Sequence, residues 1–305
     1  MNESLKLEAW ERLIRRGTLD GLPLGTKGGR IDLRGLTLPE SVETGKKTFG
    51  RYIVKEIKSS AVCRQAKWES LDFTGSNLKS VRIFDSSIRN CLFDDCQMQD
   101  FRIWSSVIAD SSFKGAKLLG AALGGVDNGK RNRFAGIDFS SADMRETAYK
   151  SASFERCIFG HTRLEKTNFQ GTSFVDCRFE GEVRDVLFNR FAFQGEEFPP
   201  NEMVNVDFRR ASLRFVDFRG LTLDRVHFPE DKEHIVIRNC AAALDKVLLL
   251  FRKQEDPAAK MLIYFLENYR KWMVPNQAQG VINARDLFEV AGENGVNLFL
   301  AALSK

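Results

Sequence analysis

The sequence predicts a mainly β protein that winds as a solenoid of short repeats and carries helices at both ends. The first observation is a five-residue period, because every fifth residue from Cys63 to Leu123 is apolar. The second is a small or compact residue two positions before most of these apolar centres, with a polar residue between the two. Neither an α-helix nor a long strand keeps a period of five. Each pentapeptide must therefore turn a corner.

The apolar centres run in three blocks that differ in phase. The second block extends from Phe134 to Phe179, and the third extends from Val183 to Phe228. Against a hydrophobic share of 43%, such an unbroken series has a chance probability on the order of 10⁻¹². The phase changes predict two interruptions of the repeat, one after Leu123 and one after Phe179.

The repeat unit resembles that of the pentapeptide-repeat family, most clearly in residues 71–75 (Leu-Asp-Phe-Thr-Gly) and 167–171 (Thr-Asn-Phe-Gln-Gly). The resemblance implies a right-handed quadrilateral β-helix, in which four pentapeptides close one square coil. The large centre residue then fills the axis, and the small residue packs between layers. With about twenty residues per coil, the repeats make about eight coils.

An amphipathic helix is predicted at the N-terminus, with Ser4 as its N-cap and Gly17 just past its end. Its apolar stripe consists of Leu5, Leu7, Trp10, Leu13 and Ile14. Residues 31–38 nearly duplicate residues 216–223, which indicates two early repeats before an insertion at 39–60. We expect this whole segment to form an irregular cap over the first coil.

Beyond residue 239 helical spacing replaces the five-residue step. One face of a first helix carries Leu244, Val247, Leu248 and Phe251. A second helix begins at Asp256 and Pro257, an N-cap followed by proline at the first helical position, and its apolar face carries Met261, Phe265, Tyr269 and Trp272. A third helical segment at 284–303 is broken near Gly292 and Gly295, and it holds Phe288, Val290, Leu298, Phe299 and Leu303.

These patterns divide the chain into three regions. We expect an N-terminal helix and irregular cap with two early repeats at 1–60, the pentapeptide-repeat β-helix at 61–238, and an α-helical domain at 239–305. The helical domain either caps the last coil or serves for dimerisation or partner docking. The second use is implied by the resemblance, because members of the family often pair through C-terminal helices.

Nothing in the sequence points to catalysis, a metal or a cofactor, so we predict that the protein is not an enzyme. The cysteines occupy inward positions of the repeat: Cys63, Cys91, Cys96, Cys157 and Cys177. Cys157 and Cys177 stack on successive coils, close enough for a disulfide, but small apolar filler is the preferred interpretation in a reducing cytosol. The three histidines, His161, His227 and His234, lack the spacing of metal ligands.

The first interruption of the repeat, residues 124–133, is the candidate partner-binding loop. A break in a regular coil projects from it, and protruding loops carry function more often than scaffold does. The candidate residues are Asp127, Asn128, Lys130, Arg131 and Arg133. The segment 194–201, with two adjacent prolines, is a second and lower-ranking bulge.

We therefore predict a non-enzymatic scaffold for protein–protein interaction, with the C-terminal helices used for dimerisation or docking and the partner unidentified. A first alternative, implied by the resemblance, is a DNA-mimic inhibitor or protector of DNA gyrase or topoisomerase. Such mimicry requires a strongly acidic rod. The net charge is +5 and residues 61–230 are close to neutral, which leaves a single acidic face at Asp94, Asp95 and Asp100.

A second alternative is direct nucleic-acid binding through the basic loop at 124–133 or through an arginine stripe. That stripe comprises Arg209, Arg210, Arg214, Arg219 and Arg225. Interleaved acids such as Asp207 and Asp217 favour an ordinary mixed-charge surface instead.

The sequence has no run of apolar residues long enough to span a membrane. Its first residues lack the basic start, apolar stretch and cleavage site of a secretory signal. We expect a cytoplasmic protein of bacterial type.

Overall fold

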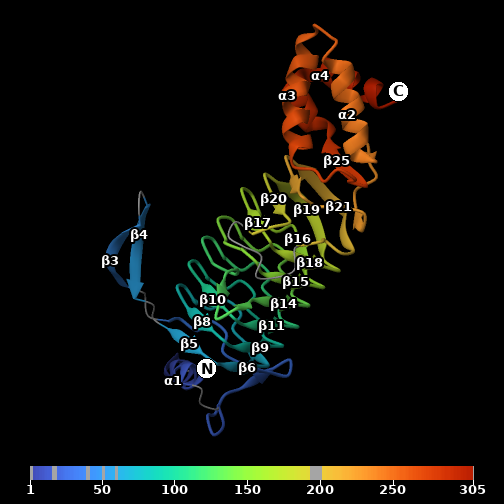
Figure 1. Ribbon diagram of the computed structural model, residues 1–305. Helices are drawn as coiled ribbons and strands as arrows, with labels where there is room; N and C mark the ends of the chain where they lie inside the picture. Colours follow the sequence, from blue (N-terminus) through green and yellow to red (C-terminus); the bar gives the residue numbers. More distant parts are fainter. Residues whose placement is uncertain are drawn as a thin grey trace. The chain divides into compact units, whose positions relative to one another are not determined.

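The computed structural model describes residues 3–15, 19–38, 61–192 and 201–304, together with the backbone of two strands at 42–49 and 52–58. The chain divides into two compact units, Met1–Arg163 and Leu164–Lys305. Figure 1 labels the helices and strands of both units.

Helix α1 (Glu3–Ile14) closes one end of the core of the first unit. Its buried residues are Ala9, Trp10 and Leu13. The ring of Trp10 lies 5.5 Å from that of Trp68 and 6.2 Å from that of Phe73. Ser4 lies inside the helix and not at its N-cap, because the helix already includes Glu3, two residues before the predicted first helical residue Leu5. The predicted stop at Gly17 lies outside the described residues.

Two short strands precede the N-terminal insertion. β1 (Thr26–Lys27) and β2 (Arg30–Asp32) form an antiparallel hairpin, and β2 also pairs in parallel with β7 (Leu71–Asp72). After β2 the chain buries Leu33, Leu36 and Leu38. Within the insertion, β3 (Val42–Phe49) and β4 (Tyr52–Lys58) pair antiparallel. The repeat pattern did not predict this hairpin, because its strands do not follow the five-residue period.

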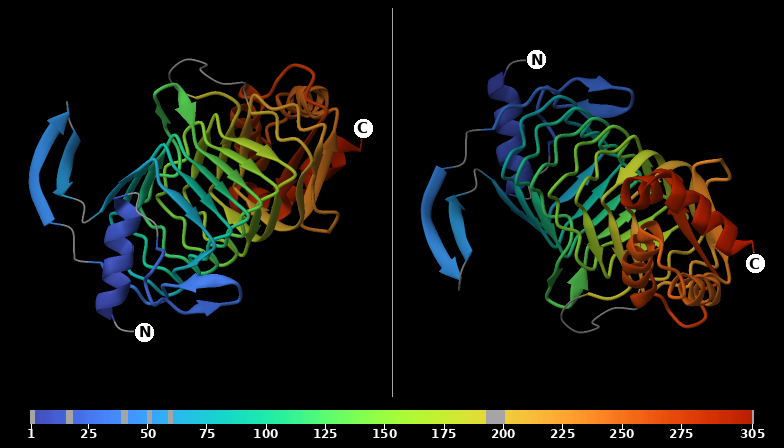
Figure 2. Two further views of the ribbon diagram at one scale, coloured as in Figure 1. Left: turned by 90° about the horizontal axis from the view of Figure 1, so that it is seen from below. Right: turned by 90° about the horizontal axis from the view of Figure 1, so that it is seen from above.

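Parallel strands stack coil upon coil in the first unit, as Figures 1 and 2 show. One sheet contains β5 (Val62–Arg64), β8 (Arg82–Phe84) and β10 (Arg102–Trp104), each twenty residues after the last. A second sheet contains β6 (Lys67–Glu69), β9 (Ser87–Arg89), β11 (Val107–Ala109), β14 (Arg133–Ala135) and β15 (Ser153–Glu155). Strand β16 (Ile158–Gly160) follows. The protein is thus mainly β, with a β-helix solenoid and terminal helices.

Stacked rings fill the axis of these coils. One series has centroid distances of 5.4, 4.7 and 5.4 Å between successive members, which are Phe73, Phe93, Phe113 and Phe139. The residues at the small inward positions form hydrogen bonds with the neighbouring coil. The backbone N–H of Ser86 donates to Ser106 Oγ at 3.0 Å, and that of Cys91 donates to Ser111 Oγ at 3.0 Å. Inward polar groups are therefore paired inside the stack.

The second unit continues with parallel strands. One sheet contains β17 (Asn168–Gln170), β20 (Leu187–Asn189) and β22 (Asp217–Arg219). Another contains β19 (Arg178–Arg184), β21 (Val206–Arg214) and β23 (Val226–His227), and β18 (Ser173–Val175) lies before β19 in sequence.

The predicted phase change after Phe179 coincides with a β-bulge. Arg178 pairs with Asp207 and Glu180 pairs with Arg210, so β21 holds one more residue than β19 at this point. Of the second predicted bulge, at 194–201, only Asn201 lies in the part of the chain that the structure describes.

Three helices and a strand pair complete the second unit. β24 (His234–Arg238) pairs antiparallel with β25 (Gln279–Asn283), and the helices are α2 (Cys240–Phe251), α3 (Pro257–Lys271) and α4 (Ala284–Leu303). Asp256 caps α3 as predicted, because its carboxylate accepts the N–H of Ala258 at 2.8 Å. Gly292 interrupts α4 with a φ of 67°. The β24–β25 pair was not predicted.

The core face of α3 differs in part from the predicted face. The α3 residues in the core are Ala259, Leu262 and Leu266, and the α4 residues include Leu287 and Phe299. Met261, which the pattern placed on the apolar face of α3, is 53% exposed, and Phe288 of α4 is 58% exposed. Apolar residues therefore stand on two faces of these helices, and only one face is covered.

Candidate functional site

The first interruption of the repeat is a short hairpin. β12 (Val126–Asp127) pairs antiparallel with β13 (Lys130–Arg131). The two turn residues, Asn128 and Gly129, have φ values of 50° and 68°, the conformation that a tight hairpin turn requires. Ile108 pairs with Phe134, twenty-six positions on, so this coil holds six residues more than its neighbours. The Asn-Gly pair was the signal for this hairpin in the sequence.

The hairpin is docked on the coil beside it. Lys130 Nζ lies 2.9 Å from Asp85 Oδ1, and its hydrogen bond lowers the pKa of Asp85. Ser105 Oγ donates to the backbone oxygen of Asp127 at 2.5 Å. Burial, followed by repulsion from the nearby Arg133, lowers the pKa of Arg131.

Asn132 anchors the base of the hairpin. It is fully buried, and its Oδ1 accepts the backbone N–H of Ser106 at 3.1 Å. Its Nδ2 donates to the carbonyl oxygens of Ile103 at 2.6 Å and Leu123 at 2.9 Å. The side chain at the end of the insertion is thus hydrogen-bonded to Leu123, just before the insertion, and to the preceding coil.

The structure brings four of the five predicted site residues together on the hairpin. Those four are Asp127, Asn128, Lys130 and Arg131. The fifth, Arg133, is exposed but belongs to β14, in a different sheet of the coil. Asn132 was not among the predicted residues, and its inward phase in the repeat was the sequence signal for its structural role.

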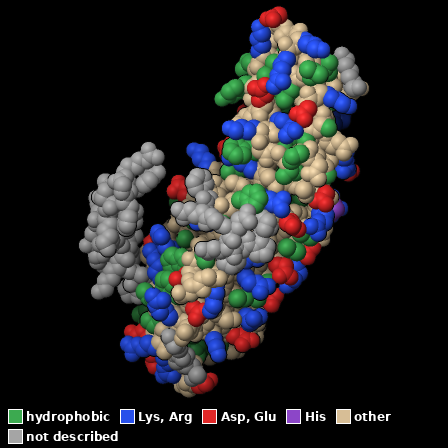
Figure 3. Space-filling view, viewed as in Figure 1, with side chains coloured by type: hydrophobic (Ala, Val, Ile, Leu, Met, Phe, Trp, Pro, Cys, Tyr) green, Lys and Arg blue, Asp and Glu red, His purple; other side chains and the backbone are tan. Residues whose placement is uncertain are grey.

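Carboxylates along the coils pair with arginines two residues further along the chain. The guanidinium Nε donates to the carboxylate at 2.7 to 3.0 Å in each of five such pairs. The pairs are Asp32 with Arg34, Asp100 with Arg102, Asp143 with Arg145, Asp207 with Arg209, and Asp217 with Arg219. The hydrogen bond from Arg34 lowers the pKa of Asp32 to about 2. Figure 3 shows basic and acidic side chains interspersed over the face in view.

The predicted acidic face is interrupted by arginines. Asp100 lies between Arg82 and Arg102, at 2.5 Å and 2.9 Å. Asp94 accepts the backbone N–H of Lys114 at 3.0 Å. The predicted arginine stripe is likewise paired, because each of Arg209, Arg210, Arg214, Arg219 and Arg225 lies within 4 Å of a carboxylate. Neither surface presents charge of one sign.

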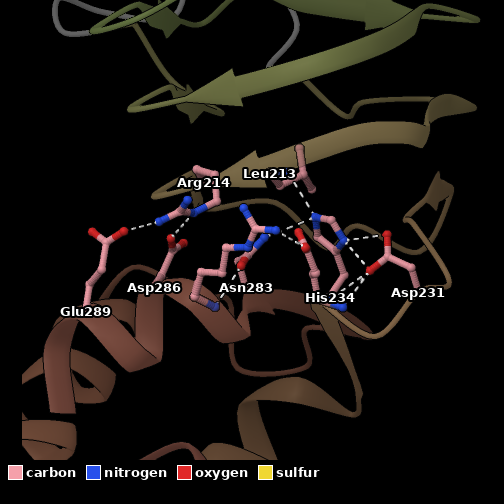
Figure 4. Close-up of polar contacts among 9 residues, drawn as sticks. Leu213, Arg214, Asp231, His234, Asn283, Asp286 and Glu289 are labelled. Atoms are coloured by element: carbon pink, nitrogen blue, oxygen red, sulfur yellow. Dashed lines mark hydrogen bonds and ion pairs between the residues drawn. The ribbon is translucent and has the colours of Figure 1, made fainter. Parts of the chain in front are cut away.

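A buried network joins the last coils to α4 within the second unit (Figure 4). The Arg214 side chain is 7% exposed, and its Nε donates to Asp286 Oδ1 at 2.6 Å. Its Nη2 pairs with Glu289, and the backbone N–H of Phe215 donates to Asp286 Oδ2 at 2.7 Å. Hydrogen bonding to Asp286 raises the pKa of Arg214. The first turn of α4 is therefore fixed to the end of β21.

His234 extends this network along β24, as Figure 4 also shows. Its Nε2 accepts the backbone N–H of Leu213 at 2.9 Å, and its Nδ1 lies 2.8 Å from Asp231 Oδ1. Both ring nitrogens thus have partners within the protein, one on β21 and one in the turn before β24. The histidine is therefore a structural link between β24 and β21.

No group of three or more metal-ligating side chains occurs among the described residues. The six cysteines are buried, and none of them forms a disulfide bond within the described part of the chain. Burial raises the pKa of Cys63, Cys91, Cys96 and Cys240 to about 12. These thiols are therefore poor nucleophiles at neutral pH. No helix in the described ranges has the length and apolar character of a membrane span.

Comparison with known proteins supports the repeat. The family model for pentapeptide repeats, eight copies long, matches residues 150–181. No curated protein matches the sequence. Among solved structures, QnrB1, a plasmid-mediated fluoroquinolone resistance protein, is 12% identical, with 52% of this chain and 84% of that chain covered and a TM-score of 0.30.

Two further solved structures are pentapeptide repeat proteins. HetL, involved in heterocyst differentiation regulation in the cyanobacterium Nostoc, is 11% identical over 54% of this chain and 86% of its own, with a TM-score of 0.26. A protein of the Arabidopsis thaliana thylakoid lumen is 21% identical over 35% of this chain and 66% of its own, with a TM-score of 0.24. The sequence match at 150–181 falls on the same five-residue period that builds the stacked coils. The chain therefore contains pentapeptide repeats, matched at 150–181, and a helical region follows the coils in the second unit.

Proposed function

We propose that this protein is a non-enzymatic scaffold for protein–protein interaction. In this proposal the repeats at 61–238 form a right-handed, four-sided rod of about eight coils, and the helical domain at 239–305 dimerises or docks a partner. The hairpin residues predicted from the sequence contribute to a partner-binding surface.

The observation that carries the proposal is the set of exposed apolar side chains on the C-terminal helices. Tyr264 is 81% exposed, and Met261 of the same helix is 53% exposed. The others are Leu249 of α2, and Phe288 and Leu300 of α4. Exposed aromatic and methionine side chains are enriched where proteins associate. Most coil positions that face outward are polar or charged by comparison.

The attachment of the helices fits this role. Arg214, Asp286 and His234 bind α4 and β24 to the end of β21 through buried hydrogen bonds. A docking surface on rigidly held helices loses little conformational freedom when a partner binds.

The test is association of full-length variants in solution. We expect sedimentation or light scattering to detect a dimer, or cross-linking in a lysate to capture a partner. Met261→Lys with Tyr264→Lys should abolish that association, because two charges would enter an apolar interface. Leu119→Lys, an exposed apolar residue of the first unit, is the matched control. Association that survives the helix variant, or a monomer without any captured partner, contradicts the proposal.

A further inference from the structure

A cavity of about 220 Å³ lies within the second unit, between the last coils and the C-terminal helices. Apolar side chains make up most of its lining: Leu213, Phe215, Val216, Phe265, Val281 and Ile282. Asn268 of α3 also lines the cavity and is exposed, so the cavity reaches the surface on that side. An apolar cavity of about 150 Å³ already holds benzene. This cavity therefore has room for a small ring compound.

Asp217 contributes a carboxylate to this lining that has few hydrogen-bond donors. Its Oδ2 accepts the Nε–H of Arg219 at 2.7 Å, and its Oδ1 is buried without a hydrogen-bond partner. A carboxylate can accept about four hydrogen bonds. Burial raises the pKa of Asp217 despite the contact with Arg219, as expected where donors are missing. The Asp217 side chain is 26% exposed, so a donor inside the cavity can still reach it.

A comparison with Asp207 shows that this shortage of donors does not come from the local sequence. Residues 207–209 and 217–219 share the pattern Asp-Phe-Arg. Asp207 accepts three hydrogen bonds from Arg209, at 2.9 Å from the backbone N–H, 3.0 Å from Nε and 2.8 Å from Nη2. Asp217 accepts one hydrogen bond from its own arginine. The surroundings of Asp217 therefore determine how many donors it has.

The helical region holds Arg219 in a second contact. The guanidinium carbon of Arg219 lies 4.5 Å from the centre of the Trp272 ring, which is a cation–π distance. The guanidinium group is thus shared between Asp217 and an aromatic ring. Sites on the Asp217 carboxylate remain for another donor.

The ionised side chains of the lining and their ion-pair partners carry an excess of negative charge. Arg219 pairs with Asp217, and Arg214 is shared between Asp286 and Glu289 (Figure 4). Three carboxylates thus face two guanidinium groups. Asp286 lines the cavity, but both of its oxygens already accept hydrogen bonds. Among the described residues that line the cavity none is basic. The cavity therefore favours a cation, which Asp217 can bind.

We propose that this cavity binds a small amine whose ammonium group is joined to a compact apolar body. The ammonium group would donate to Asp217, because charged donors form stronger hydrogen bonds with carboxylates than neutral donors do. The apolar body would pack against Phe265 and Val281. The inference goes beyond the proposed scaffold, because neither of the described residues Met261 and Tyr264 lines the cavity.

Other small molecules fit this lining less well. A carboxylic acid would place a further negative charge beside Asp217 and Asp286, and like charges at close range repel one another. A neutral alcohol can donate one hydrogen bond to Asp217, but it leaves the excess negative charge uncompensated.

The test is calorimetric titration of the full-length protein with phenethylamine, phenethyl alcohol and hydrocinnamate. These probes share a phenyl ring on a short chain and differ in charge. We expect saturable binding of the amine, at least about tenfold tighter than binding of the alcohol, and no detectable binding of the acid at neutral pH. Amine binding no tighter than alcohol binding would overturn the proposal, as would the absence of amine binding.

Asp217→Asn removes the charge and keeps an acceptor of the same shape. It should weaken amine binding at least about tenfold and change alcohol binding less than about twofold. Asp207→Asn is the matched control, because it removes the same charge from the same local pattern outside the cavity. This control should change amine binding less than about twofold. Equal weakening by the two substitutions would contradict a site at Asp217.

Val216→Phe is a second variant that leaves Asp217 in place. Its larger side chain would fill part of the cavity, so the amine and the alcohol should both bind at least about fivefold more weakly. Unchanged affinity in this variant would sink the proposal, even if Asp217→Asn fails to fold. Met261→Lys with Tyr264→Lys should bind the amine normally even where it abolishes association, so the two proposals can fail separately.

Discussion

Polar groups are bound differently in two parts of the molecule. One part is the repeated coils, and the other is the places where the repeat is interrupted or ends. Within the coils the same surface pair recurs, as at Asp207 and Arg209, where the arginine side chain is 65% exposed. At the end of β21, Arg214 is 7% exposed and shared between Asp286 and Glu289. The coils therefore spread their polar stabilisation over many weak contacts, whereas the interruptions and the end depend on a few buried groups.

Arg214→Ala should have the largest effect on stability. The substitution leaves the buried carboxylate of Asp286 without its guanidinium partner, and such a loss costs about 3–5 kcal/mol. Arg209→Ala removes an exposed pair of the coil and should cost less than about 1 kcal/mol. Urea unfolding of both variants measures the two free energies. Equal losses of unfolding free energy in the two variants would contradict the comparison. The end of the coil stack would then depend on single side chains no more than the coils do.

Asn132→Ala should have an intermediate effect. It removes three hydrogen bonds at the base of the hairpin and leaves the N–H of Ser106 buried without an acceptor, which should cost about 2–3 kcal/mol. Asn77 lies on the coil surface, where its Oδ1 accepts the backbone N–H of Lys79 at 3.3 Å. Asn77→Ala should cost less than about 0.5 kcal/mol. A larger loss at Asn77 than at Asn132, again in urea unfolding, would contradict the role given to the interruption.

The same contrast explains which parts of the fold could be predicted from the sequence. Each coil centre is supported by equivalent residues twenty positions away, so the pattern identified Phe93, Phe113 and Phe139 as buried without ambiguity. The helical region has no such redundancy. In α3, Met261 and Leu262 are adjacent apolar residues, and tertiary packing alone determines that Leu262 enters the core.

The candidate site was predictable only in part. A projecting loop at 124–133 was predicted from the break in the period. The Asn128-Gly129 pair, typical of a tight hairpin turn, could also have identified the hairpin. The contact of the hairpin residue Lys130 with Asp85 could not be predicted. The two residues lie far apart in sequence, and only the stacking of the coils brings them together. Arg214 likewise reads as a surface residue of the repeat, and only the position of α4 buries it.

The smallest expected effect is a pair of opposite pH dependences. Asp207-Phe208-Arg209 and Asp217-Phe218-Arg219 have the same local pattern. The hydrogen bond from Arg209 lowers the pKa of Asp207, whereas burial raises the pKa of Asp217 despite its contact with Arg219. The ionised form is thus favoured by folding at one position and disfavoured at the other.

The signs follow from proton linkage. Asp207 contributes stability that is present above the unfolded pKa of about 3.9 and is lost as pH falls through its lowered folded pKa. Asp217 imposes a penalty that is absent below about pH 3.9 and grows as pH rises through its raised folded pKa. Relative to the parent protein, Asp207→Asn should therefore lose stability as pH rises toward 4, and Asp217→Asn should gain stability as pH rises above 4.

Urea unfolding of the two variants and the parent between about pH 3 and 6 measures these slopes. The other titrating groups are common to all three proteins and cancel in the difference. We expect less than about 1 kcal/mol at Asp207, because its partner is exposed. Slopes of the same sign would show that the neighbourhood of β22 shields Asp217 from water no more than an ordinary coil face does. Opposite slopes would identify burial beside the C-terminal helices, and not the local pattern, as the determinant of its ionisation.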